Sequence, residues 1–224
     1  MTLNKQKGNM YSFITHTWNP IKGKCPHQCS YCYYQNNPCF NPKIGKLRLD
    51  EKTLFDSLGK NNFIFVGSST DMFAEEVPSE WIEKVLKWCI GYNKNKYLFQ
   101  SKNPKRFLEF KDTFPKNTIL GTTIETNRNQ HIVYFSKAPL VQDRVEYLKN
   151  NIYKTMVTIE PIMDFDLEQL INLIKKVNPE WVNIGADSQN SNLPEPSPEK
   201  VKALIKELNK YTEVKVKDNL KRLL

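Results

Sequence analysis

The sequence predicts an α/β fold, a partial, open β/α barrel of about six parallel strands. Short β-rich apolar runs recur along the chain, amphipathic helical patterns separate them, and polar residues follow the runs. The runs follow one another at the spacing of a βαβ unit, roughly 30 residues. Six or seven such units fit into 224 residues, short of the eight that close a barrel. We therefore expect an open barrel that forms a single domain over residues 1–224.

Six segments have the composition of buried strands, and a seventh is a further candidate. The clearest is Phe63–Gly67, because four apolar residues run up to a glycine. The others are Tyr11–Thr17, Lys96–Ser101, Thr118–Ile124, Lys154–Glu160, Trp181–Ala186 and the candidate Glu213–Lys217.

Helical patterns fill the intervals between these strands. Ser79 is a suitable N-cap for a helix through Tyr92, in which Trp81, Val85, Leu86 and Cys89 share one face. That face places Cys89 in the core as a packed thiol. Pro104 opens another helix. The remaining helices are expected at Ala138–Asn150, Asp166–Val177 and Ser197–Tyr211.

The composition excludes several classes of protein. Hydrophobic residues make up 39% and charged residues 25% of the chain, which rules out a collagen-like, low-complexity or wholly disordered protein. No apolar run approaches the roughly 18 residues that span a bilayer. The N-terminal residues lack the apolar segment of a signal peptide, so we expect a cytoplasmic protein without membrane contact.

The net charge of +9 is concentrated at the two ends of the chain. Residues 1–60 hold nine Lys and Arg against three Asp and Glu, and residues 200–224 hold eight against three. Two basic ends around a near-neutral centre fit a rim that binds a polyanion. A solvated lysine-rich surface explains the same composition.

Polar residues stand where successive strands end. They are Ser68–Asp71, Ser101–Asn103, Thr122–Glu125, Glu160 and Asp187–Ser188. The carboxyl ends of parallel strands meet at one edge of a sheet, where such folds place their chemistry. Loop polarity or helix capping explains one such end, but five in succession favour a shared polar pocket.

Three of the five cysteines, Cys25, Cys29 and Cys32, fall within eight residues just after the first strand. In a cytosolic chain, the C-x3-C-x2-C spacing indicates a metal centre rather than disulfides. Three thiolates that hold a 4Fe–4S cluster leave one iron open for an external ligand. A structural zinc site with Cys39, His27 or His16 as the fourth ligand is the main alternative. Reduced cysteines without metal are a second alternative.

This motif, with aromatic Tyr31 before its third cysteine, resembles that of the radical S-adenosylmethionine (radical SAM) superfamily. A fuller resemblance, over most of the chain, is to small, often phage-encoded members related to spore photoproduct lyase and similar DNA-repair proteins. The segments that carry it are Thr17–Pro20, Ser69–Phe73, Val77–Ile82, Ser101–Arg106, Ile159–Pro161 and Trp181–Gly185.

The resemblance implies a set of site residues. Cys25, Cys29 and Cys32 hold the cluster, whose open iron takes the amino and carboxylate groups of SAM. Tyr31 flanks the adenine. Thr123 and Glu125 suit the ribose hydroxyls or the sulfonium, and Gly185 and Asp187 lie near the adenine. Members of the superfamily often carry a Gly-Gly-Glu-like segment for the methionine amine; here Gly67–Ser69 stands there, so Ser69 and Asp71 are the candidates.

Structural roles compete with several of these assignments. Tyr31 also suits core packing, Glu125 also suits an ion pair with Arg128, and Glu160 also suits one with Lys102. Otherwise Lys102 is expected to bind a substrate phosphate or the SAM carboxylate, and Glu160 to contact substrate.

The resemblance also implies the reaction. One electron from a flavodoxin or ferredoxin enters the cluster, SAM is cleaved to methionine and a 5′-deoxyadenosyl radical, and that radical abstracts hydrogen from a substrate. We expect a monomer without an auxiliary cluster, in the host cytoplasm if the chain is phage-encoded.

Kinship with repair enzymes and the basic ends favour DNA, RNA or a modified nucleotide as substrate. Tyr33, Tyr34 and Phe40 are available to stack on bases. A small metabolite or peptide is the alternative substrate. A non-catalytic iron–sulfur or zinc module that binds nucleic acid is the alternative class of protein.

Overall fold

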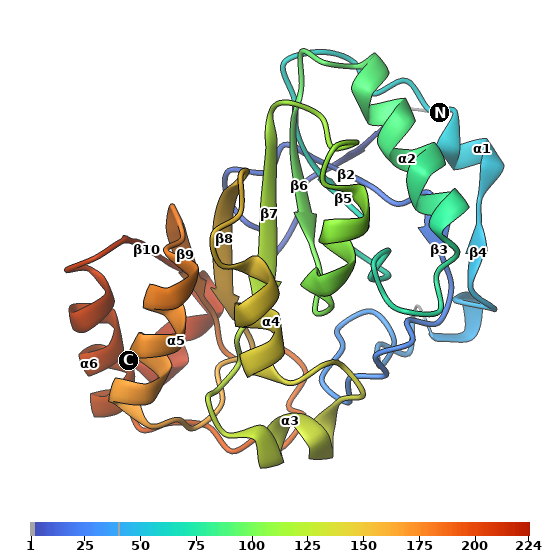
Figure 1. The fold of residues 1–224 in the computed structure, drawn as a ribbon. Helices are drawn as coiled ribbons and strands as arrows, with labels where there is room; N and C mark the ends of the chain where they lie inside the picture. The colour runs from blue at the N-terminus through green and yellow to red at the C-terminus, as the bar shows by residue number, and fades with distance from the viewer. Residues whose placement is uncertain (1–2, 40) are drawn as a thin grey trace.

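The computed structural model describes residues 3–39 and 41–224. Its framework is an eight-stranded sheet in the order β1-β2-β5-β6-β7-β8-β9-β10 (Figure 1). From β2 to β10 all neighbours pair in parallel, and only β1 runs antiparallel, to β2. The strands are β1 (Asn4–Lys5), β2 (His16–Trp18), β5 (Phe63–Val66), β6 (Lys96–Gln100), β7 (Thr118–Thr123), β8 (Lys154–Ile159), β9 (Trp181–Ile184) and β10 (Glu213–Val216).

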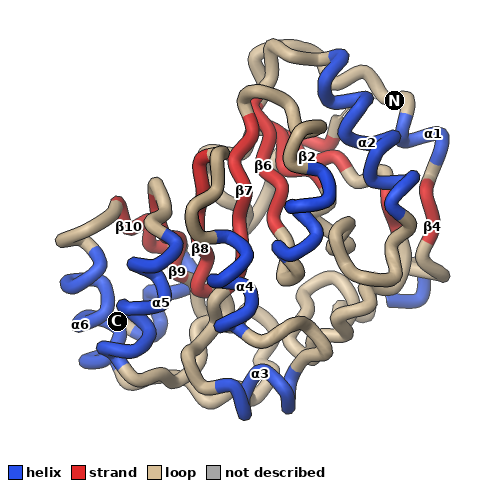
Figure 2. The backbone as a smooth tube through the Cα atoms, viewed as in Figure 1, coloured by secondary structure: helices blue, strands red, loops and turns tan. Residues whose placement is uncertain are grey.

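The predicted partial barrel is confirmed, with seven parallel strands rather than about six. The helices lie outside the strands, as the tube in Figure 2 shows. They are α1 (Glu51–Leu54), α2 (Ser79–Gly91), α3 (Asn129–Phe135), α4 (Val141–Leu148), α5 (Leu167–Val177) and α6 (Pro198–Leu208). Short 3-10 helices stand at η1 (Asn41–Lys43), η2 (Pro104–Phe110) and η3 (Asp218–Leu223), and a small hairpin pairs β3 (Ile21–Lys22) with β4 (Arg48–Leu49).

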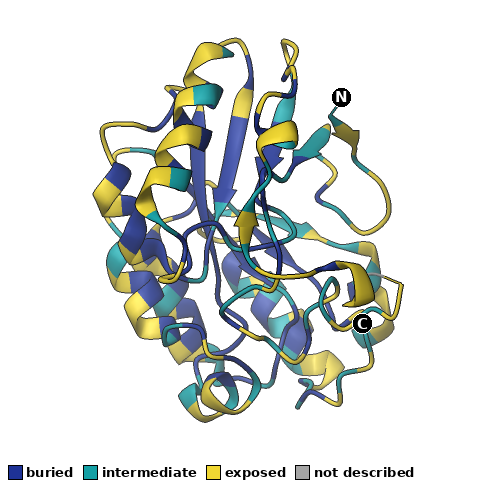
Figure 3. Cartoon of the chain, turned by 90° about the vertical axis from the view of Figure 1, so that its right-hand side faces the viewer, coloured by how far each residue is buried: buried dark blue, intermediate teal, exposed yellow. Residues whose placement is uncertain are grey.

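Local sequence explains where the helices begin and end. In α6, the Ser197 hydroxyl accepts a hydrogen bond from the Lys200 amide, and Pro198 occupies the first turn. Helix α5 ends at Asn178, whose left-handed backbone lets its amide donate to the carbonyls of Ile174 and Lys175. The exposed residues of the helices face outward (Figure 3), while the central strands β5 to β9 are almost wholly buried.

Alternate residues of the strands point to opposite faces of the sheet and pack into two separate apolar layers. On the outer face of the sheet, Ile64 and Val66 of β5 join the large core formed with the helices. On the inner face, Phe65 packs with residues from the neighbouring strands and from the N-terminal segment. That inner cluster consists of Tyr11, Ile14, Phe65, Leu98, Ile119 and Met156, with Met10, Phe13, Phe63 and Trp181 packed against it. Residues 10–14 thus fill the concave side of the sheet.

The first strand was predicted over Tyr11–Thr17, but the structure begins it only at His16. The apolar residues before it turn back, with the Ile14 amide donating to the Tyr11 carbonyl, and enter the concave face. An apolar run that plugs a barrel has the same composition as a buried strand, which explains the error. We call residues 10–14 the inner plug.

Other differences are smaller. The helix expected at Ala138–Asn150 is the shorter α4, and Pro104 opens a 3-10 helix. Cys89 is fully buried in α2, so its assignment to the core is confirmed. Within the described residues, no helix is both long and apolar enough to cross a bilayer.

Substitution of Ile14 by alanine tests the inner plug. Ile14 is 2% exposed, so we expect the cavity left behind to reduce the free energy of unfolding by about 2–5 kcal/mol. Urea denaturation followed by circular dichroism measures the change. Ile152, which is 80% exposed, provides the matched control, and its replacement by alanine should change stability by no more than about 0.5 kcal/mol. Equal effects of the two substitutions would contradict the plug.

Candidate functional site

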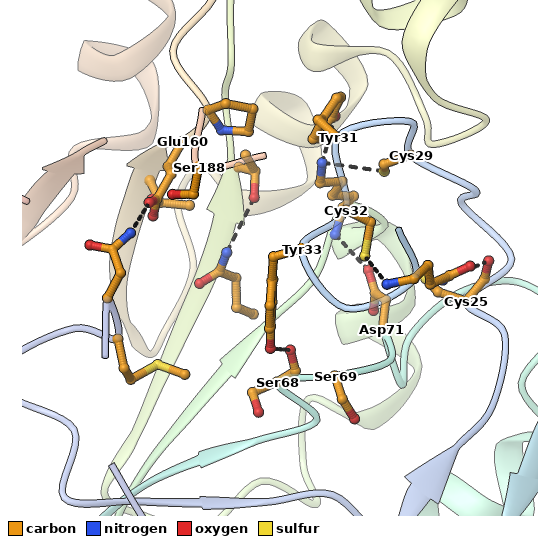
Figure 4. A pocket seen from close by; sticks show the side chains of 18 of the residues that line it. Cys25, Cys29, Tyr31, Cys32, Tyr33, Ser68, Ser69, Asp71, Glu160 and Ser188 are labelled. Carbon is orange, nitrogen blue, oxygen red and sulfur yellow. Dashed lines mark hydrogen bonds between the residues drawn. The ribbon is translucent and has the colours of Figure 1, made fainter. Parts of the chain in front are cut away.

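A cavity of about 470 Å³ opens at the carboxyl edge of the sheet (Figure 4). The cysteine loop and Asp71 form one wall, and Glu160 and Ser188 stand on the opposite side with Tyr33 between them. Its further lining comes from both ends of the chain, including Lys7, Asn9, Met10, Tyr11 and Lys217. This volume is in the range that holds a cofactor-sized ligand.

Two tight turns present the three cysteines. The Gln28 amide donates to the Cys25 carbonyl, the Cys32 amide donates to the Cys29 carbonyl, and Gln28 itself has a positive φ of 45°. All three cysteines are half-buried, carry free thiols and line the cavity. The loop starts at Gly23, where a Cβ would lie 2.2 Å from the Lys46 carbonyl oxygen, so only glycine fits.

Hydrogen-bond donors surround the sulfur atoms. Ser136 Oγ lies 3.1 Å and Lys102 Nζ 3.5 Å from Cys29 Sγ, and the Gln35 amide lies 3.4 Å from Cys32 Sγ. Burial raises the pKa of the Cys25 thiol to about 12 and also raises that of Cys32. A metal that binds here must therefore displace thiol protons, as thiolate coordination requires.

The donor set of the cysteine loop is compatible with an iron–sulfur cluster. Three thiols, whose thiolates are the ligands that such clusters take, line one cavity, and hydrogen-bond donors lie near the sulfurs of Cys29 and Cys32. A structural zinc site needs a fourth ligand. In residues 3–39 and 41–224, no group of three or more His, Cys, Asp or Glu side chains is arranged around one metal position.

Asp71 fastens the cysteine loop to the sheet. Its carboxylate accepts hydrogen bonds from His27 Nε2 at 2.8 Å, from the Ser101 hydroxyl at 2.9 Å and from the amides of Lys102 and Phe73. Burial opposes its ionisation, but His27 and these donors outweigh burial and hold the pKa of Asp71 below its usual range. Asp71 therefore joins the cysteine loop to the end of β6.

Glu125, which is fully buried, is the centre of a second network. One carboxylate oxygen accepts from Tyr31 Oη at 2.6 Å and Lys102 Nζ at 2.5 Å, and the other accepts from Arg144 Nη1 at 2.8 Å. Lys102 Nζ also donates to Tyr31 Oη at 2.7 Å and lies 4.4 Å from the centre of its ring. Burial would raise the pKa of Glu125, but Arg144 and Lys102 prevail and hold it well below its usual range.

Glu160 binds residues from both ends of the chain. Its carboxylate accepts from Lys217 Nζ at 2.6 Å and from the side-chain amides of Asn9 and Asn219, each at 3.0 Å. Gly185 lies directly beside it, and a Cβ there would stand 2.6 Å from Glu160 Oε1. The absence of a side chain at Gly185 thus makes room for the Glu160 carboxylate.

The sequence comparisons give a family. Residues 9–196 match the family model described as a protein of unknown function, DUF5131, and the match covers most of the chain. The chain belongs to the DUF5131 family. Among curated proteins, no sequence match was found.

Solved structures share the fold of this DUF5131 protein. Spore photoproduct lyase with bound AdoMet and dinucleoside spore photoproduct aligns with a TM-score of 0.61 and 11% identity over 92% of this chain and 64% of that chain. A second spore photoproduct lyase structure aligns with a TM-score of 0.66 and 9% identity over 94% of this chain and 78% of that chain. Streptococcus suis SuiB bound to precursor peptide SuiA aligns with a TM-score of 0.61 and 11% identity over 93% of this chain and 50% of that chain. The expected radical SAM fold is confirmed, and the chain spans about two thirds or less of the lyase–AdoMet and SuiB chains.

Most predicted site residues of the DUF5131 chain meet at the cavity. Its lining includes Cys25, Cys29, Tyr31, Cys32, Ser69, Asp71, Lys102, Thr123, Glu160 and Asp187. Glu125 lies behind Tyr31 and Lys102 without any exposed surface, and Gly185 lies behind Glu160. Cys39 is exposed and outside the lining, Tyr33 is 48% exposed at the cavity, and Phe40 lies outside the described residues.

Two ion pairs that the sequence offers as alternative structural roles are wrong. Glu125 pairs with Lys102 and Arg144, whereas Arg128 pairs with Asp164 and Asp166. Glu160 pairs with Lys217 rather than with Lys102. For Glu125, proximity along the chain is misleading, because its partners lie 23 and 19 residues away from it. For Glu160, tertiary packing brings Lys217 rather than Lys102 to the carboxylate.

Sequence reasoning overlooked Arg144 and Lys217. Arg144 is buried on the apolar face of α4, with Val141, Val145 and Leu148, and a lone arginine on such a face could have indicated a buried acid nearby. Lys217 directly follows β10, so the strand-end argument would have included it had that strand been relied upon.

The Glu125 network predicts a pH-dependent stability. The pKa of Glu125 in the folded protein lies below the unfolded value of about 4.3. The stability that ionised Glu125 contributes is therefore present above that pH and is lost as the pH falls toward the folded pKa. Glu125→Gln should lose less stability between pH 5 and pH 3 than the wild type. Chemical denaturation at each pH measures this, and identical pH profiles would contradict it.

Proposed function

We propose that this DUF5131 protein is a radical SAM enzyme that acts on a nucleic acid or a modified nucleotide. A 4Fe–4S cluster held by Cys25, Cys29 and Cys32 would, when bound, deliver the electron that cleaves SAM to methionine and a 5′-deoxyadenosyl radical, which abstracts hydrogen from substrate. A flavodoxin- or ferredoxin-type protein is the proposed reductant, and the enzyme is proposed to act as a monomer.

One observation carries the proposal. The three cysteines of a C-x3-C-x2-C motif line a single cavity at the carboxyl edge of a partial barrel. Structures with the same fold are described with bound AdoMet in spore photoproduct lyase and with S-adenosylmethionine in SuiB. A cavity of about 470 Å³ leaves room for such a ligand beside the thiols.

The cavity residues suggest how SAM is held. Lys102 is a cation on the wall and suits the SAM carboxylate. Ser69 is the better candidate for the methionine amine, because the Asp71 carboxylate already accepts four hydrogen bonds. Thr123 and Asp187 supply oxygens for the ribose and adenine side, and Tyr31 presents its ring beside Lys102 for the adenine.

Other residues orient and protect this site. Glu125 fixes the positions of Lys102 and Tyr31 from behind, and Asp71 fixes the cysteine loop through His27. The inner plug shuts the concave side of the barrel with apolar side chains, which excludes water from below the cavity.

The substrate proposal rests on charge and aromatic exposure. Lys7 and Lys217, one from each basic end, both line the cavity, where they suit a phosphate group. Tyr33 is exposed at the same cavity and presents a ring on which a base can stack. Spore photoproduct lyase, which shares the fold, is described with a dinucleoside spore photoproduct.

Anaerobic reconstitution tests the chemistry. After addition of iron and sulfide, reduction with dithionite and addition of SAM, we expect 5′-deoxyadenosine by liquid chromatography. Cys29→Ala should abolish the product and lower the iron content, because the motif then supplies two thiolates. Cys39→Ala and Cys89→Ala are the matched controls and should keep both. Loss of iron in Cys39→Ala, or tightly bound zinc in the wild type, would favour the binding-module alternative.

Salt dependence tests the substrate class. We expect fluorescently labelled single-stranded DNA to bind with an affinity that falls steeply between 50 and 200 mM salt, as counterion release requires. Lys7→Ala should weaken that binding by about threefold to tenfold, the worth of roughly one lost phosphate contact of about 1 kcal/mol. Lys176→Ala, on the outer helix α5, is the control. Cleavage of SAM without any polyanion affinity would favour a small metabolite or a peptide.

A further inference from the structure

Ser136 stands out among the residues that touch the cysteine loop. Its segment, which directly follows α3, runs beside that loop and is held in register by two backbone hydrogen bonds. The Ser30 amide donates to the Phe135 carbonyl at 2.9 Å, and the Lys137 amide donates to the His27 carbonyl at 2.8 Å. These two bonds lie on either side of Ser136 in one segment and of Cys29 in the other, so the backbone itself places the hydroxyl against the sulfur.

The hydroxyl hydrogen of Ser136 has two acceptors to choose from. Ser136 Oγ lies 3.1 Å from Cys29 Sγ and 3.3 Å from the His27 carbonyl oxygen. It also accepts a hydrogen bond from the Ala138 amide at 3.1 Å, which fixes its orientation. Because sulfur is the larger atom, a contact of 3.1 Å to it is the tighter of the two. A thiolate, being charged, is also a stronger acceptor than a carbonyl group.

Lys102 does not replace this donor. Its ammonium group lies further from Cys29 Sγ, at 3.5 Å, and donates two short hydrogen bonds to Glu125 and Tyr31. Among the described residues, Ser136 therefore makes the shortest side-chain hydrogen bond to a sulfur of the motif. Ser136 is also buried, so water does not compete for its hydroxyl group.

We infer that Ser136 donates a hydrogen bond to the Cys29 sulfur when Cys29 ligates the cluster, and that this bond makes the cluster easier to reduce. Hydrogen bonds to ligand sulfurs withdraw electron density and stabilise the added electron, which raises the reduction potential. Ser136 is thus a positioning and tuning residue that acts through Cys29. The inference rests on the proposed function, since it requires the cluster.

The experiment measures a potential rather than turnover. Wild type, Ser136→Ala and Ser136→Thr are reconstituted anaerobically and titrated with dithionite, and the reduced cluster is followed by electron paramagnetic resonance. We expect the midpoint potential to become more negative in Ser136→Ala and to stay at the wild-type value in Ser136→Thr. Ser30→Ala is the matched control, because Ser30 is an exposed serine adjacent to Cys29. An unchanged potential in Ser136→Ala at full iron content overturns the inference.

Two further outcomes separate this inference from the proposed function. If the wild-type protein takes up no cluster, the proposed function fails before Ser136 is tested. If Ser136→Ala alone loses the cluster, the isosteric pair Ser136→Thr and Ser136→Val decides, because the two differ only in the hydroxyl group. A cluster at the wild-type potential in Ser136→Thr with a lower potential or no cluster in Ser136→Val supports the inference, and identical behaviour of that pair overturns it.

Discussion

A buried carboxylate cannot be left without donors, and the site of this protein is organised around that constraint. Glu125 has no exposed surface, and its oxygens bring together the cysteine loop through Tyr31, the end of β6 through Lys102, and α4 through Arg144. Asp71, which follows β5, repeats the arrangement two strands away from Glu125, which follows β7, and His27 is its contact to the loop. The two carboxylates determine where a loop of little regular structure lies relative to the sheet.

The third carboxylate, Glu160, organises the opposite side of the cavity. It attracts Asn9 from the first residues and Lys217 and Asn219 from the last, so the two basic ends of the chain meet at one point. The cavity is therefore walled by segments that lie far apart in the sequence. Charges that are separate in the sequence become neighbours at the cavity.

The sequence could predict the elements that have a local cause. Apolar runs such as Phe63–Gly67 predict strands, the polar residues at the strand ends predict the cavity lining, and the cysteine spacing predicts a loop that faces the cavity. It could not predict which cation meets which carboxylate, because Arg144 and Lys217 reach their partners only through tertiary packing. The sequence of the inner plug resembles that of a strand because burial on the concave face selects the same side chains as burial in a sheet.

The inner plug also has a consequence for the order in which the protein is made. Residues 10–14 leave the ribosome well before Leu98, Ile119 and Met156, against which they pack. The hydrogen-bond partner of Asn9, Glu160, is made later still, because it lies 151 positions further along the chain. Contacts between such distant residues form slowly because a long loop must close first. During synthesis the inner plug thus lacks part of its packing partners until β8 has emerged, and the cavity is complete only after Lys217, which also lines it, has been made.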